Sequence, residues 1–226
     1  MLFSLIKSPL DFTGFIIGII LSLTLHAYAQ AWMAARLGDH TARFAGRMSL
    51  NPSRHFDPTG TVFLVLFGFG WSKPIPINIS ALSHKYDRAK IALAGIAAQI
   101  LLAVVVAIPF SIARGFFGLG SDSNVILYIF NIIFQITLWM TAINLLPIPP
   151  LDGATIIRSL APASWEESVN QFEKYGPLVL LGAVLFEILL NIPVLSPLLF
   201  AVTRFLEFLV MYPITVVIKS IVLLFS

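Results

Sequence analysis

The chain has 226 residues, of which 58% are hydrophobic and only 11% are charged, and its mean hydropathy is +0.92. So little polar surface cannot cover a water-soluble globule of this size, and the bilayer is therefore the expected solvent. The net charge of +3 is too small to indicate a nucleic-acid-binding protein. The absence of cysteine excludes disulfides, thiolate zinc ligands and a catalytic thiol. No polar stretch is long enough to build a second core, so residues 1–226 are expected to form a single membrane domain.

Five segments are apolar enough to be expected as membrane-spanning helices, because a bilayer core about 30 Å thick needs roughly 20 apolar residues in a helix. In chain order they cover residues 12–35, 89–113, 124–146, 177–192 and 195–218. The prolines at positions 147, 149 and 150 should end the third helix, and Pro213 should break the fifth.

Residues 59–71 are also apolar, but this segment of about 13 residues is short for a span. The glycines and prolines of residues 68–78 favour a re-entrant, β-like hairpin, and the alternative is a short, distorted sixth span. The expected fold class is thus an all-α polytopic membrane bundle of five to six transmembrane helices, with a short re-entrant β-like hairpin after the first.

The positions of lysine and arginine predict the orientation, because cytoplasmic loops near helix ends retain them. Eight of these residues follow the first helix, namely Arg36, Arg43, Arg47, Arg54, Lys73, Lys85, Arg88 and Lys90. The opposite face has little beyond Lys7 and Arg114. Residues 37–90 are therefore expected to be cytoplasmic, in a multi-pass protein of the cell inner membrane.

Two polar groups of residues stand out, because ionisable side chains at membrane depth are costly and should face the bundle interior. His26 and Gln30 are four residues apart in the first helix and share one face of it. Asp152 follows the proline-rich end of the third helix, which returns to the side of the membrane toward which His26 lies. A histidine and a carboxylate are thus expected to meet at a common metal position.

These residues resemble the motifs of the site-2 protease family of intramembrane zinc metalloproteases. In that family a helix carries H-E-x-x-H, whose histidines bind zinc and whose glutamate is the general base, and a distant L-D-G aspartate is the third ligand. The resemblance covers residues 12–160, and its most specific part is the N-L-L-P-x-P-P-L-D-G string at 144–153. It implies that His26, Gln30 and Asp152 occupy the metal-ligand positions and Ala27 the general-base position. Residues 161–226 add C-terminal helices without a motif.

The departures from the family pattern predict impaired chemistry. Ala27 cannot take a proton from a water molecule, and a missing general base typically costs about 10²- to 10⁴-fold in rate. The neutral amide of Gln30 is a weak zinc ligand, so zinc is implied by the family while its occupancy here is expected to be low. Gln99 also stands where the family's A-G-P-x-x-N pattern has asparagine.

The resemblance also implies a substrate-binding region in which the hairpin pairs with an extended substrate segment. Its expected residues are Gly68, Gly70, Trp71, Lys73, Pro74 and Asn144. The implied partners are transmembrane protein substrates or helices, with the lipid bilayer around them and no nucleic acid. The three other histidines, His40, His55 and His84, are expected to be solvated loop residues.

Three functions follow from these observations. The first is an intramembrane zinc metalloprotease scaffold that hydrolyses peptide bonds in or near transmembrane segments, impaired or inactive through Ala27 and Gln30. The alternative is a non-catalytic pseudoprotease that binds membrane helices. A small transporter or channel has less support, because the chain has no paired inverted halves and few intramembrane charges.

Overall fold

The computed structural model describes residues 8–58, 60, 72–120 and 124–225, and in these residues the regular elements are helices, without a β-strand. Four helices are long and apolar enough to cross a membrane. They are α1 (Pro9–Arg36), α4 (Asp87–Phe117), α5 (Val125–Leu145) and α8 (Ser196–Phe225). The protein is therefore a multi-pass membrane protein. The other elements are α2 (Thr41–Phe44), η2 (Pro52–Arg54), η3 (Ile79–Ala81), α6 (Asp152–Leu160), η5 (Ala163–Trp165) and α7 (Glu166–Leu190).

The number of candidate spans in the described residues is four, whereas the sequence predicts five or six. The difference lies mainly in α7, which has acidic and basic residues along its first turns and becomes apolar only from Pro177 onward. At 1.5 Å per residue that apolar part is about 20 Å long, shorter than a hydrocarbon core of roughly 30 Å.

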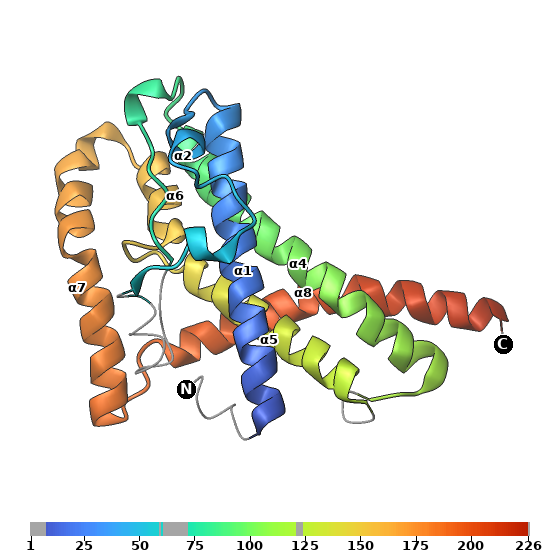
Figure 1. The fold of residues 1–226 in the computed structure, drawn as a ribbon. Coiled ribbons are helices and arrows are strands. Elements are labelled where there is room, and N and C mark those ends of the chain that lie inside the picture. Colours follow the sequence, from blue (N-terminus) through green and yellow to red (C-terminus); the bar gives the residue numbers. More distant parts are fainter. Residues whose placement is uncertain (1–7, 59, 61–71, 121–123, 226) are drawn as a thin grey trace.

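Helices α1, α4 and α5 form the centre of the molecule, where α4 and α5 cross α1 obliquely (Figure 1). Small residues on α1 allow α5 to come close. A Cβ atom added at Gly18 would lie 3.1 Å from Cβ of Ile136, and one at Gly14 would lie 2.9 Å from Cβ of Ile132. Around this contact the side chains of Ile19 and Leu138 are almost completely buried. The bundle thus packs tightly around the buried face of α1 that carries the polar residues.

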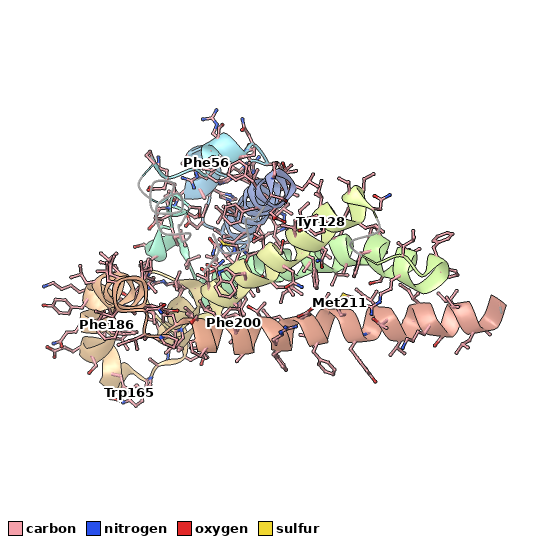
Figure 2. The ribbon with its side chains drawn as sticks, turned by 90° about the horizontal axis from the view of Figure 1, so that it is seen from below. Phe56, Tyr128, Trp165, Phe186, Phe200 and Met211 are labelled. Atoms are coloured by element: carbon pink, nitrogen blue, oxygen red, sulfur yellow. The ribbon has the colours of Figure 1, made fainter. Side chains whose placement is uncertain are left out.

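Helix α8 runs along one side of α4 and α5 and exposes most of its apolar side chains (Figure 2). Phe200 of α8 and Trp139 of α5 pack edge to face, with ring centroids 5.3 Å apart. At the start of α8, the buried carboxylate of Glu187 accepts hydrogen bonds from the backbone N–H groups of residues 194, 195 and 196. Helix α8 continues through Pro213, so the expected break there is wrong. In spanning helices, neighbouring groups re-satisfy the backbone that proline leaves unpaired.

The expected re-entrant segment with its β-like hairpin covers residues 59–78, of which 59 and 61–71 lie outside the described residues, and the described residues 72–78 form no strand. What the structure shows beside it is one isolated antiparallel bridge between Phe56 and Ser72. After this bridge the chain continues without regular structure to η3, as the extended trace in Figure 1 shows.

Candidate functional site

The first part of the site is a buried face in the middle of α1. His26 is 6% exposed and Ala27 is 1% exposed, and Gln30 follows one turn later on the same face as His26. The facing surface of α4 is Gly95. A Cβ atom there would lie 2.7 Å from Cε1 of His26 and 2.9 Å from Cγ of Gln30. Only a glycine therefore lets α4 lie directly against these two side chains.

The second part of the site is the start of α6. Helix α5 ends at Leu145, before the prolines, as predicted, and Asp152 is the first residue of α6. A Cβ atom at Gly153 would collide with the carbonyl oxygens of Leu145 and Leu146. A glycine directly after Asp152 therefore allows α6 to fold back against the end of α5, which turns the carboxylate toward α1.

The structure brings His26, Gln30 and Asp152 together. Nε2 of His26 lies 3.1 Å from Oδ2 of Asp152, and Nε2 of Gln30 donates a 2.8 Å hydrogen bond to Oδ1 of the same carboxylate. Despite this 3.1 Å contact, Oδ2 of Asp152 has no hydrogen-bond partner. Nδ1 of His26 is likewise buried without one. One carboxylate oxygen is thus satisfied and the other faces the imidazole.

A second polar group links the three central helices next to this site. Gln99 of α4 is completely buried, and its amide nitrogen donates a 2.9 Å hydrogen bond to the hydroxyl of Ser22 on α1. Its amide oxygen accepts a 3.1 Å hydrogen bond from Asn144 of α5. Asn144, expected to bind substrate, is therefore held by α4, and its amide nitrogen already has an acceptor.

The third part is the segment that enters η3. Lys73 and Pro74 are exposed, while Gly68, Gly70 and Trp71 lie outside the described residues. Lys73 is fixed through its backbone: its N–H donates to the carbonyl of His55 at 2.8 Å, and its carbonyl accepts from Nη2 of Arg47 at 2.6 Å. At the other end, the backbone N–H of Asn78 donates to Oδ2 of Asp39 at 2.7 Å.

The sequence-based expectation that His55 is a solvated loop residue, like His40 and His84, is wrong. The latter two are exposed, but His55 is 2% exposed, and its Nε2 lies 2.7 Å from the carbonyl oxygen of Ser49. Burial lowers the pKa of the His55 ring, and the nearby Arg47 guanidinium lowers it further, against the opposing effect of the Ser49 carbonyl. The neutral ring thus carries its proton on Nε2.

Asp39 and Arg47 are further buried residues that the sequence interpretation did not single out, with exposed fractions of 1% and 5%. Burial raises the pKa of the Asp39 carboxyl, but hydrogen bonds from Thr41 and Asn78 outweigh this and hold the pKa below its usual range. The one signal in the sequence was the concentration of basic residues after the first helix, which pointed to orientation and not to a structural role for Arg47.

Comparison with known proteins identifies the family. The family model described as "Peptidase family M50" matches residues 106–186. The protein named "Putative zinc metalloprotease YwhC" of Bacillus subtilis (strain 168) is 37% identical over 187 residues, which are 81% of this chain and 84% of that protein. The chain belongs to peptidase family M50. This is the site-2 protease family that the motifs resemble.

Other M50 relatives are more distant. "Putative zinc metalloprotease Rip2" of Mycolicibacterium smegmatis is 30% identical over 175 residues, covering 69% of this chain and 65% of that protein. The protein of the same name from Mycobacterium tuberculosis (strain H37Rv) is 28% identical over the same length. No solved structure matches the chain. The stretch matched by the M50 family model contains Asn144 and Asp152 but not His26 or Gln30.

Membership of the M50 family implies zinc, and the residues present fit such an ion only in part. A catalytic zinc site has three protein ligands and one open position. His26 and Asp152 are close enough to share one ion. Gln30, however, presents its amide nitrogen, which has no lone pair to give to a metal, and this nitrogen is bonded to Asp152. No cluster of three His, Cys, Asp or Glu side chains occurs among the described residues. The donor set therefore does not fit a catalytic zinc site.

Proposed function

We propose that the chain is an M50-type scaffold for hydrolysing peptide bonds in or near transmembrane segments, in which the catalytic step is severely impaired. The observation that carries this proposal is the hydrogen bond from Gln30 to Asp152. Gln30 stands at the position where the family has its second histidine ligand, and its amide nitrogen donates to one oxygen of the carboxylate and has no lone pair to give to a metal. Ala27, buried and without a proton-accepting atom, fills the general-base position.

The residues of this chain still have definite roles in the proposed scaffold. His26 and Asp152 are the two ligands of the family that remain, and Gly95 keeps α4 close enough to exclude bulk water from them. Asn144 and the segment from Lys73 to Asn78 are proposed to hold the substrate chain. Residues 37–90 are proposed to face the cytoplasm, with residues 12–160 as the core of a single domain and α7 as a fifth membrane-embedded element.

The second candidate is a non-catalytic protein that binds membrane helices. It is favoured by the same polar contact, because Gln30 satisfies half of the Asp152 carboxylate without any metal. The two candidates differ in one measurable respect. Restoring the missing ligand and the general base should return zinc binding and cleavage to an impaired protease. The same changes should not give cleavage to a protein specialised for binding.

A repair series tests the proposal with the full chain in detergent. Four proteins are compared: the chain itself, Ala27→Glu, Gln30→His and the double variant. Bound zinc is measured after removal of free metal, and cleavage is measured on a single-span model substrate. Gln30→His alone should bind one zinc per chain, because it restores the third ligand. Only the double variant should cleave at a substantial rate, about 10²- to 10⁴-fold faster than Gln30→His.

Asp152→Asn in the double variant is the control, and it should lose most of the bound zinc because an amide replaces a carboxylate ligand. The proposed impairment would be overturned if the unaltered chain bound as much zinc and cleaved the substrate as fast as the double variant. A double variant that binds zinc but cleaves nothing would favour the non-catalytic candidate.

A further inference from the structure

A pocket of about 350 Å³ lies between the start of α4, the end of α6 and the start of α7. These three helix ends lie at the same end of the molecule (Figure 1). The charged residues that line the pocket are Lys85, Arg88, Arg158 and Glu166. The described lining residues do not include the three at the metal position, so the proposed function gives this pocket no role.

The two arginines of the pocket share one carboxylate. Nη1 of Arg158 lies 2.6 Å from Oε2 of Glu173, while Nη2 of Arg88 lies 3.8 Å from Oε1 of the same side chain. The second distance is too long for a hydrogen bond, so the guanidinium donors of Arg88 remain available. Glu173 carries a single negative charge and therefore cannot neutralise both arginines.

Lys85 has no carboxylate partner among the residues that the structure describes. Its Nζ donates a 2.8 Å hydrogen bond to the carbonyl oxygen of Ala161, which itself lines the pocket. This bond holds the ammonium group at the pocket wall. An ammonium group has three N–H donors, so two of them are still free to bind a ligand.

The charges around the pocket do not balance. The three cations Lys85, Arg88 and Arg158 face the two carboxylates Glu166 and Glu173, which leaves one positive charge in excess. A phosphodiester carries one negative charge, and its two free oxygens accept the charge-assisted hydrogen bonds that guanidinium and ammonium groups donate. It therefore matches both the excess charge and the available donors.

The surroundings of the pocket are typical of a membrane interface. Lys85 and Arg88 lie on either side of the first residue of α4, which is a candidate span. On α6, Ile157 and Leu160 are exposed close to Arg158, and Trp165 is exposed directly before α7. Basic residues with apolar neighbours and exposed aromatic rings are found where lipid phosphates lie.

We propose that this pocket binds the phosphodiester headgroup of an anionic phospholipid, with Lys85, Arg88 and Arg158 as the donors to the phosphate. A lipid is favoured over a soluble phosphate because the exposed apolar side chains on α6 can contact acyl chains. An anionic headgroup is favoured over a zwitterionic one because the ammonium group of the latter would leave the excess positive charge in place. The site goes beyond the proposed function, and no residue of the metal position takes part in it.

Binding of dioctanoyl phosphatidylglycerol to the full chain in neutral detergent, measured by calorimetry, tests the site. One lipid should bind per chain. Lys85→Gln and Arg88→Gln should each weaken binding roughly 3- to 10-fold, because each removes a charge-assisted hydrogen bond at a partly exposed place. Glu166→Gln should tighten binding roughly 2- to 5-fold, because it removes a carboxylate that repels the phosphate.

Two further variants separate charge from other effects. Lys174→Gln is the matched control, because it removes a positive charge from an exposed position of α7 that does not line the pocket, and it should change binding less than 2-fold. Lys85→Arg keeps the charge and should also bind within 2-fold of the unaltered chain. Losses of the same size in Lys85→Gln and Lys174→Gln would show that only the net charge of the protein matters and would overturn the site.

The choice of ligand tests the lipid assignment. Dioctanoyl phosphatidylcholine, which has the same phosphodiester and an added cation, should bind roughly 5-fold more weakly than phosphatidylglycerol. Inorganic phosphate that binds as tightly as phosphatidylglycerol would assign the pocket to a soluble phosphate and overturn the lipid assignment. None of these measurements involves zinc or cleavage, so failure of the repair series would leave the lipid site standing, and failure of lipid binding would leave the proposed function standing.

Discussion

Gln30 donates a 2.8 Å hydrogen bond from its amide nitrogen to Oδ1 of Asp152, across 122 positions of the chain. The bond joins the middle of α1 to the first residue of α6. It satisfies one oxygen of a carboxylate whose side chain is 14% exposed, while the other oxygen faces His26. In this chain the polar residues at the metal position therefore hold one another, and their contribution to stability can be measured without a metal.

Loss of the Gln30 amide should destabilise the protein. Gln30→Ala leaves Oδ1 of Asp152 without its donor, and the expected loss in free energy of unfolding is about 1–3 kcal/mol, the usual cost of an unsatisfied buried polar group. The measurement is chemical unfolding of the purified chain in mixed micelles without added zinc. Asp152→Asn is the comparison, because its amide oxygen still accepts from Gln30 and should cost less. Equal stability of Gln30→Ala and the unaltered chain would contradict the bond.

The contact of Gly95 with His26 and Gln30 predicts a strict requirement for glycine. In Gly95→Ala the new methyl group would lie 2.7 Å from Cε1 and 2.8 Å from Nδ1 of His26, so the ring has to move. Overpacking of this kind costs about 1–3 kcal/mol. In the Gln30→His background it should also lower zinc affinity, because the displaced imidazole no longer points at the shared position.

Gly182→Ala is the matched control for this change. Gly182 also lies inside a helix, but a Cβ atom there would meet nothing within 4 Å. Because alanine is the better helix former, Gly182→Ala should be neutral or stabilise the protein by up to about 1 kcal/mol. Similar losses in both variants would show that helix propensity, and not contact with His26, explains the effect at Gly95.

The sequence predicted the four candidate spans with ends within four residues of the observed ones, except that α8 ends at Phe225 and not at residue 218. Runs of apolar residues and prolines mark these ends locally. It also pointed to His26 and Asp152 through two short motifs. The burial of His55 was not predicted, because it depends on contacts with Ser49, Arg47 and Lys73 in an irregular loop. Such a loop has no periodic sequence pattern from which its buried residues could be identified. The direction of the Gln30 amide likewise depends on a partner 122 residues away.

The buried amide of Gln99 should link the three central helices energetically. Gln99→Leu has a similar volume but leaves Ser22 without its donor and Asn144 without its acceptor, in a completely buried place. We expect a loss of about 1–3 kcal/mol in free energy of unfolding. The double variant Ser22→Ala with Gln99→Leu should lose less than the sum of the single changes, because one unsatisfied group is removed. Additive losses would contradict a shared hydrogen bond.

The depressed pKa of His55 predicts that acid loosens the loop whose His55 carbonyl holds the backbone N–H of Lys73. Because the folded-state pKa lies below that of the unfolded chain, the unfolded state takes up the proton first as the pH falls through about 6.5, the ordinary value. The free energy of unfolding should therefore decrease as the pH falls from 7.5 to 5. The shift at Asp39 has the same sign but acts only below about pH 4, so it does not contribute in this window.

His55→Gln identifies the source of this pH dependence. A glutamine side chain has an amide donor for the Ser49 carbonyl but no titrating group, so the variant should lose less stability between pH 7.5 and 5 than the unaltered chain. Hydrogen exchange at Lys73 reports on the loop directly and should accelerate with acid, after correction for intrinsic exchange rates, only where His55 is present. An equally steep acid response in His55→Gln would assign the effect to another group. A flattened response would show that His55 must stay neutral for the backbone of Lys73 to stay fixed.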